Sequence, residues 1–139
     1  MRGSATLTDR DAIVDLAVRL GAWLDERGFD TDDGRALYAE DVLVHSPSGV
    51  YRGLEEVLEH LRETSPRDQR TFHAHSDFAV AVDGDGATLA ANQVVYFYRP
   101  GGELFQTSGL RVDYTLTRTP DGWRLATMRI SLRWQRTHD

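Results

Sequence analysis

The chain has 139 residues, a length that fits one domain around one hydrophobic core. Its hydrophobic fraction of 40% and charged fraction of 27% are typical of a globular protein, so neither a disordered nor a fibrous chain is indicated. The formal net charge of -6 disfavours nucleic acid and anionic membranes as partners, since phosphate binding needs a basic face.

Cysteine and lysine are both absent from the sequence. The lack of cysteine excludes disulfides, thiolate nucleophiles and cysteine-ligated zinc, and the lack of lysine excludes Schiff-base chemistry. No apolar run approaches the roughly 20 residues that span a bilayer, and residues 1–8 lack the apolar core of a signal peptide. We therefore expect a cytoplasmic protein without a membrane partner.

The first half of the chain has mainly helical patterns. From Ile13 to Leu24 apolar residues recur at three- and four-residue steps, which predicts a first helix with Thr8 as its N-cap and Gly28 as its stop. A second, short helix is predicted over residues 33–38. Residues 41–45 then resemble a short strand, 46–49 a turn, and 53–63 a third helix.

The second half consists of four long runs rich in valine, threonine and aromatic residues, at 71–82, 87–99, 104–118 and 123–135. Short segments of Gly, Pro and Asp separate these runs, so an antiparallel meander is expected. Strands this long must curl around a helix and leave a cavity. The predicted fold is α+β: one domain with three N-terminal helices packed on a strongly bent, mixed but mostly antiparallel sheet that forms a cone with an internal pocket.

Four strings of the sequence resemble the SnoaL-like family of the nuclear-transport-factor-2-like superfamily. They are the entry to the first strand at 37–42, Arg-Thr-Phe-His at 70–73, Val-Asp-Gly-Asp at 82–85, and the hairpin at 118–124. The order of the predicted elements is similar to that superfamily over essentially the whole chain, 1–139. Catalytic members of this branch include scytalone dehydratase, bile-acid dehydratases, steroid isomerases and polyketide cyclases, while other members only bind or assemble.

The resemblance implies that Asp25 and His73 are a catalytic pair. Dehydratases of this family pair an aspartate of the first helix with a histidine early in the second strand, and both positions are occupied here. Histidine both takes and gives a proton at neutral pH, and a buried carboxylate fixes its tautomer and stabilises its cation. The alternative is that Asp25 caps or salt-bridges the end of the helix and His73 is a satisfied strand histidine.

His75 is a possible auxiliary residue, because strand alternation places it on the same face as His73 and Asp77. Two histidines at this spacing with a carboxylate also suit a metal, but no third ligand is evident, so no metal is predicted. If that face lies outside, all three residues are polar surface. No other cofactor is expected either.

Three more side chains are candidates for an auxiliary role. His45 ends the first strand beside Ser46, where steroid isomerases of this fold have their general-base aspartate; His45 is either a substitute base or a strand-end histidine. Tyr96 or Tyr98 would polarise a substrate oxygen if it faces inward, and packs otherwise. The side chains expected to contact the substrate are Trp23, Phe72, Asn92 and Phe97.

Two functions from different classes fit these features. The first is a cofactor-independent dehydratase, isomerase or cyclase of secondary metabolism that acts by acid-base catalysis on a small apolar oxygenated substrate such as a polyketide. The second is a non-catalytic binding or assembly module, which the lack of a third-strand histidine and of the isomerase aspartate favours. A homodimer through the sheet is expected, because alternating apolar residues of the last strand leave surface to cover: Leu125, Met128, Ile130, Leu132 and Trp134.

Overall fold

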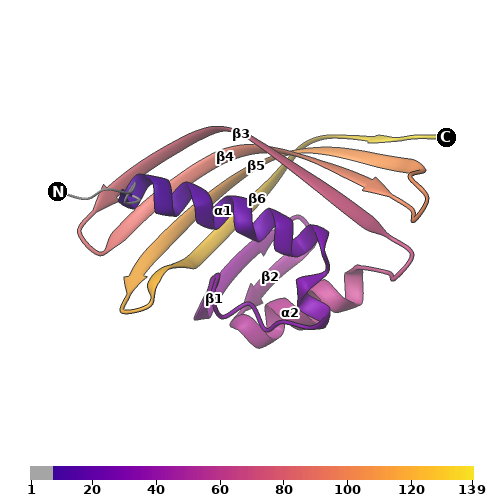
Figure 1. Cartoon of the computed structure of the whole chain (residues 1–139). Helices are drawn as coiled ribbons and strands as arrows, with labels where there is room; N and C mark the ends of the chain where they lie inside the picture. The colour runs from indigo at the N-terminus through magenta and orange to yellow at the C-terminus, as the bar shows by residue number, and fades with distance from the viewer. Residues whose placement is uncertain (1–7) are drawn as a thin grey trace, which may run out of the picture.

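A long helix and a strongly bent six-stranded sheet make up most of the molecule in the computed structural model, which describes residues 8–139 (Figure 1). The elements follow in the order α1 (Asp9–Asp25), the 3-10 helix η1 (Gly28–Asp30), β1 (Tyr38–Ser46), β2 (Gly49–Arg52), α2 (Leu54–Thr64), β3 (Arg70–Asp83), β4 (Gly86–Tyr98), β5 (Leu104–Thr119) and β6 (Gly122–Thr137). Within the described residues, no helix has the length and apolar character needed to cross a membrane.

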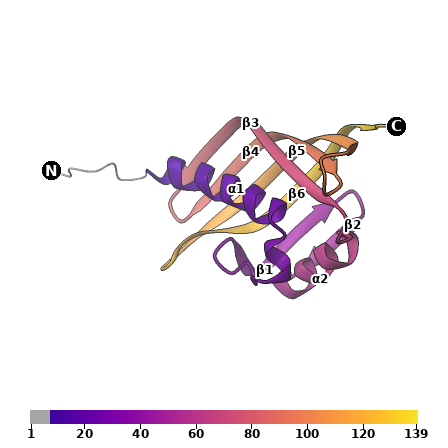
Figure 2. The same cartoon turned by 45° about the vertical axis from the view of Figure 1, so that its right-hand side comes forward.

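The sheet has the strand order β2-β1-β6-β5-β4-β3. β3 to β6 form the predicted antiparallel meander, and β1 joins β6 in parallel. The long strands bend over α1, which lies along the concave side of the sheet, while α2 packs beside β1 and β2 at one end (Figures 1 and 2). This arrangement places the C-terminal end of α1 beside the start of β3.

α1 begins as the sequence predicts. The Thr8 side chain accepts a hydrogen bond from the backbone N–H of Asp11 at 3.2 Å, as an N-cap does. The apolar face of the helix is buried against the sheet, with Ile13, Leu16 and Leu20 almost completely inaccessible to solvent. Asp9 in its first turn accepts two hydrogen bonds from Arg118 of β5, at 2.9 and 2.8 Å, which ties the helix to the β5–β6 hairpin.

The predicted helix over 33–38 is wrong, and the described residues contain two α-helices rather than three. The side chains of Asp32 and Asp33 accept hydrogen bonds from the backbone N–H groups of Gly34 and Arg35, both at 3.0 Å. Such local bonds compete with a helix, and Gly34 has a φ of +75°, outside the helical region. The segment turns and then enters β1 at Tyr38, while the predicted turn at 46–49 leads into an additional strand, β2.

An irregularity in β3 reverses which residues face the core. Before it, His73 and His75 face α1; after it, Phe78 and Val80 contact the core. The pairing with β4 shifts between Ser76 and Ala79, and Asp77 takes a left-handed φ of 56°. The extra residue of such a bulge breaks the two-residue alternation of the strand.

Candidate active site

Asp25 and His73 are in direct contact between the end of α1 and the start of β3. His73 Nδ1 lies 2.6 Å from Asp25 Oδ1, and both side chains are largely buried. The same carboxylate accepts hydrogen bonds from the Thr71 hydroxyl at 3.0 Å and from the backbone N–H of His73 at 3.1 Å. Three donors from one short stretch of β3 therefore hold the carboxylate of Asp25.

This geometry fixes the tautomer of the His73 ring. An ionised carboxylate only accepts hydrogen bonds, so Nδ1 of His73 carries a hydrogen and donates it in a hydrogen bond to Asp25. The lone pair of a neutral ring then lies on Nε2, which makes no hydrogen bond to another residue in the described part of the chain. His73 lines a pocket, so this arrangement provides a proton acceptor at the wall of that pocket.

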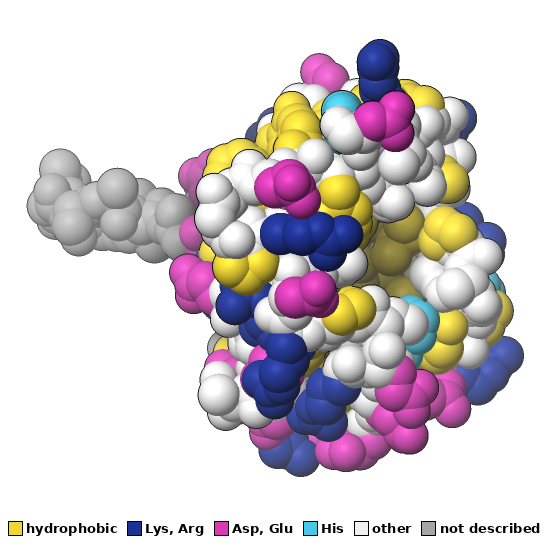
Figure 3. Space-filling view, turned by 90° about the vertical axis from the view of Figure 1, so that its right-hand side faces the viewer, with side chains coloured by type: hydrophobic (Ala, Val, Ile, Leu, Met, Phe, Trp, Pro, Cys, Tyr) yellow, Lys and Arg dark blue, Asp and Glu magenta, His cyan; other side chains and the backbone are white. Residues whose placement is uncertain are grey.

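The pocket has a volume of about 250 Å³ and lies between the end of α1, the end of α2 and the concave side of the sheet. An engineered cavity of about 150 Å³ binds benzene, so there is room here for a larger ring system. Figure 3 shows a hollow with hydrophobic side chains in its floor on the face that is at the right of Figure 1. Its apolar lining consists of Leu24, Phe29, Leu61, Val95, Phe97, Leu110 and Ile130.

His75 belongs to a second polar group beside the pair. Gln93 Nε2 lies 3.0 Å from His75 Nε2 and 3.0 Å from the Tyr114 hydroxyl. Since an amide nitrogen only donates, His75 accepts at Nε2 and its ring is neutral in this arrangement. Burial lowers the pKa of His75, and the nearby His73 lowers it further. His75 does not line the pocket.

Gly21 allows α1 to approach these two histidines. A Cβ atom at this position would lie 2.7 Å from Cε1 of His75 and 3.4 Å from Cβ of His73. Any side chain there would push the helix or the His75 ring out of place.

Three predicted site residues lie on the outer face of the sheet. Phe72 and Tyr96 form a tilted aromatic pair there and are 57% and 37% exposed. Asn92 is also exposed, and it donates to Asp77 at 3.0 Å and accepts from Arg111 at 3.1 Å. The alternation of β4 explains the error, because its odd-numbered residues are the ones that face the core.

The other predicted residues have different surroundings. Phe97 lines the pocket, as expected of a wall residue, but Trp23 does not; it packs edge-on against Phe29 and Tyr38 in the core. Neither Tyr98 nor His45 lines the pocket. Asp77 is turned away from His73 by the bulge, and no group of three potential metal ligands occurs among residues 8–139.

Two residues of the site escaped the sequence analysis. Thr71 stands two residues before His73, so alternation placed it on the same face, and its hydroxyl was an available partner for Asp25. Gln93 could not be paired with His75 from sequence alone, because that contact depends on the register of β3 against β4.

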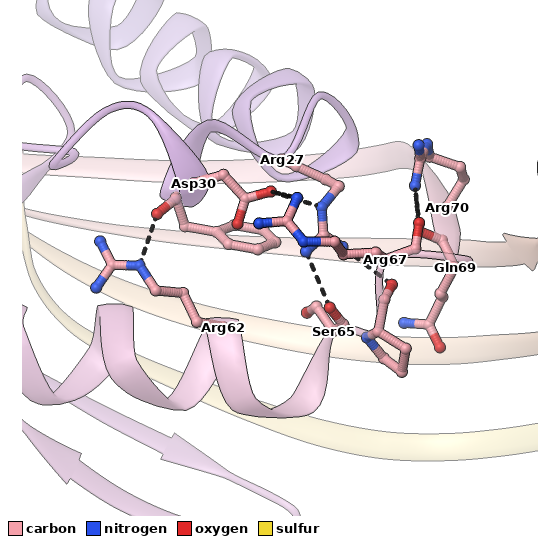
Figure 4. A network of polar contacts seen from close by, with 9 residues as sticks. Arg27, Asp30, Arg62, Ser65, Arg67, Gln69 and Arg70 are labelled. Carbon is pink, nitrogen blue, oxygen red and sulfur yellow. Dashed lines mark hydrogen bonds and ion pairs between the residues drawn. The ribbon is translucent and has the colours of Figure 1, made fainter.

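Arg27 closes one side of the pocket. Its backbone has a left-handed φ of 56°, and its side chain donates to Asp30 at 2.8 Å and to the backbone carbonyls of Ser65 and Pro66 at 3.0 and 3.1 Å (Figure 4). It therefore joins the turn after α1 to the loop after α2. The guanidinium of Arg27 also holds the pKa of Asp30 below its usual range.

These features define a class of protein: a cone-shaped α+β domain with a largely apolar pocket and a histidine-aspartate pair at its wall. The chain belongs to the SnoaL-like domain family, whose model matches residues 5–129, and it shares the fold of the nuclear-transport-factor-2-like superfamily.

The comparisons include proteins with and without a named activity. An uncharacterized protein of Mycobacterium tuberculosis is 28% identical over 130 residues, which cover 90% of this chain and 86% of that protein. The crystal structure of the Kfla4162 protein from Kribbella flavida is 25% identical and has a TM-score of 0.82, covering 92% of this chain and 93% of that one. A hexachlorocyclohexane dehydrochlorinase, LinA type 2, is 17% identical with a TM-score of 0.77 and coverages of 94% and 88%.

Proposed function

We propose that this protein is a cofactor-independent enzyme of the dehydratase, isomerase or cyclase type. In this proposal His73 is the general base and acid, and Asp25 orients its ring and stabilises the cation that forms when Nε2 takes a proton. The observation that carries the proposal is the 2.6 Å contact between His73 Nδ1 and Asp25 Oδ1 at the wall of an apolar pocket.

The substrate of this proposal is a small, largely apolar, oxygenated metabolite, for which a polyketide is one example. Most of the pocket lining is hydrocarbon, which suits an apolar body. A base in such a pocket can remove a proton from carbon beside a carbonyl. His73 can then return that proton to a departing hydroxyl, which is an elimination of water, or to another carbon, which is an isomerisation. The LinA dehydrochlorinase has the same fold, which supports elimination as a chemistry that this fold accommodates.

A probe that needs no knowledge of the natural substrate tests the base. In 5-nitrobenzisoxazole, removal of the ring C–H proton breaks the N–O bond and gives a nitrile and a coloured phenolate, with no second proton transfer. We expect the wild-type protein to accelerate this reaction. His73→Gln should reduce the rate by about 10² or more, the usual contribution of general-base catalysis.

Two further variants serve as a second test and a control for this measurement. Asp25→Asn should also slow the reaction, because a neutral amide stabilises the protonated ring less than a carboxylate does and can present its N–H groups to Nδ1. His60→Gln is the matched control, since His60 stacks on Tyr51 outside the pocket, and should leave the rate unchanged. Equal rates for wild type and His73→Gln would reject His73 as the base and leave the non-catalytic binding module as the better description.

A further inference from the structure

Four arginines lie along one side of the pocket. We call Arg27, Arg62, Arg67 and Arg70 the arginine rim; in Figure 4 Arg27, Arg62 and Arg67 are drawn near Asp30, and Arg70 lies further along, beside Gln69. Asp30 is 2.8 Å from Arg27 Nε and 3.8 Å from Arg67 Nη1. The whole chain has a formal net charge of -6, so this concentration of positive charge runs against the charge of the molecule.

The four guanidinium groups differ in how their N–H groups are used. Arg27 donates from all three of its nitrogens, to Asp30 and two carbonyls, and Arg62 donates from Nε to the carbonyl of Phe29 at 2.9 Å. Arg70 uses Nη1 for the carbonyls of Arg67 and Gln69, at 2.7 and 3.0 Å. Its Nε and Nη2 make no hydrogen bond within residues 8–139, and Arg67 is 85% exposed with one long ion pair. Arg67 and Arg70 therefore retain donors for a further acceptor.

Other nearby carboxylates contact different partners. Asp68 and Glu103 lie 3.5 and 3.4 Å from Arg99, which is outside the arginine rim. Asp25 accepts hydrogen bonds from Thr71 and His73. Within residues 8–139, the ion pairs of the arginine rim are those with Asp30, so these four guanidinium groups have one carboxylate in contact with them.

The loop that carries Arg67 and Arg70 forms one wall of the pocket. Thr64, Ser65, Gln69 and Arg70 all line it, while the sheet side is mainly apolar apart from Thr71 and His73. The loop between α2 and β3 lies at the end of the molecule where Figure 3 shows the hollow (Figure 1). The pocket is thus cationic and polar on its loop side and mainly hydrocarbon on its sheet side.

We propose that the ligand of this pocket carries a carboxylate, which binds Arg67 and Arg70 while the apolar body of the ligand lies against the sheet beside His73. Guanidinium groups match a carboxylate in shape as well as charge. The inference rests on the proposed function, because it assigns the substrate class of the same site.

A matched pair of probes tests this proposal by isothermal titration. 2-Naphthoate and 2-naphthamide have the same aromatic body and differ mainly in charge. In 50 mM salt we expect naphthoate to bind about three- to tenfold more tightly, the range that a few partly exposed charge pairs give. The preference should disappear in the double variant R67Q/R70Q and shrink in wild-type protein at 500 mM salt.

The control variant R10Q/R52Q removes the same two charges at exposed arginines that do not line the pocket, and it should keep the preference. Circular dichroism and thermal melting establish that R67Q/R70Q is folded, and the salt arm needs no variant. Equal binding of the two probes to wild type, failure of both to bind, or a preference that survives in folded R67Q/R70Q would each overturn the proposal.

The two proposals fail separately. 5-Nitrobenzisoxazole has no carboxylate, so the difference in its turnover between wild type and His73→Gln tests the role of His73 as a base and is independent of the arginine rim. Turnover without a preference for naphthoate rejects only the carboxylate inference. A naphthoate preference without turnover rejects only the enzyme.

Discussion

His73 and His75 stand two residues apart on one strand and have opposite hydrogen-bonding roles. His73 donates from Nδ1 to a carboxylate, which leaves Nε2 available as an acceptor. His75 accepts at Nε2 from the amide of Gln93, so a proton on that nitrogen removes the bond. The partner of each ring, rather than its residue type, decides which histidine suits proton transfer.

The lowered pKa of His75 predicts how stability depends on pH. Between the lowered folded pKa and the usual value of 6.5, the unfolded chain binds more protons than the folded one. The free energy of unfolding should therefore fall as pH drops below about 6.5 and rise towards neutral pH. The slope due to His75 should be smaller than the roughly 1.4 kcal/mol per pH unit of one full proton, because the ring is only partly buried.

Urea unfolding of wild type and His75→Gln at pH 5, 6 and 7.5 measures this effect. His75→Gln should show a shallower slope, since the new amide oxygen can accept from Gln93 at every pH. His60→Gln should change the slope less: burial lowers the pKa of His60 too, but this ring accepts no hydrogen bond from a described residue. Identical slopes in wild type and His75→Gln would contradict the assignment.

Among the elements, β3 shows best which structural features the sequence predicts and which it does not. Its approximate extent follows from a long run rich in β-formers, and strand alternation predicted that His73 and His75 share one face, without saying whether that face lies inside. The bulge at Asp77 was not, because the sequence pattern of β3 does not show where one residue is skipped in the pairing with β4. The outward facing of Asn92 was missed, and that of Tyr96 was left open, for a similar reason, since alternation gives two faces without saying which is inside.

The bulge requires a left-handed backbone conformation at residue 77, and this requirement can be tested. Asparagine tolerates a left-handed φ, whereas a β-branched side chain is strained there. Asp77→Val should lower the free energy of unfolding by about 1–2 kcal/mol relative to Asp77→Asn, which keeps a side chain able to bond locally. Urea titration of both variants measures the difference, and equal stabilities would mean that β3 can re-pair without its bulge.

At the scale of the whole molecule, the expected homodimer stays a prediction, but its residues change. Leu125, Met128 and Ile130 belong to the core or contact it, so most of the apolar stripe of β6 is not surface. The exposed aromatic residues are Phe72, Tyr96 and Trp134. Phe72 pairs directly with Tyr96, while Trp134 pairs with Gly109 of β5, whose partner on β4 is Val94, two residues from Tyr96. Exposed apolar patches of this kind mark interaction sites.

Sedimentation velocity tests this revised surface. We expect the wild-type protein to sediment as a dimer and F72E/W134E as a monomer, because two buried carboxylates oppose association. Val18→Glu is the matched control: it places a charge at a residue that is 48% exposed on α1, and it should remain dimeric. A monomeric wild type would show that the aromatic residues do not form a self-association surface.

The hydrogen bonds between Asp25 and β3 also protect one edge of the sheet. β3 is the last strand of the sheet, and an edge strand offers unpaired N–H groups to any other strand that meets it. Asp25 Oδ2 accepts the hydrogen bond from the backbone N–H of His73. The carboxylate that orients the His73 ring therefore also makes this N–H unavailable for pairing with a strand of another molecule. Under the proposed function, proton transfer and protection of this sheet edge both depend on one side chain. Asp25→Ala should remove both the acceptor for the His73 ring and the acceptor for the backbone N–H of His73. Asp25→Asn keeps an oxygen for the backbone N–H, so comparing the two variants distinguishes the two roles.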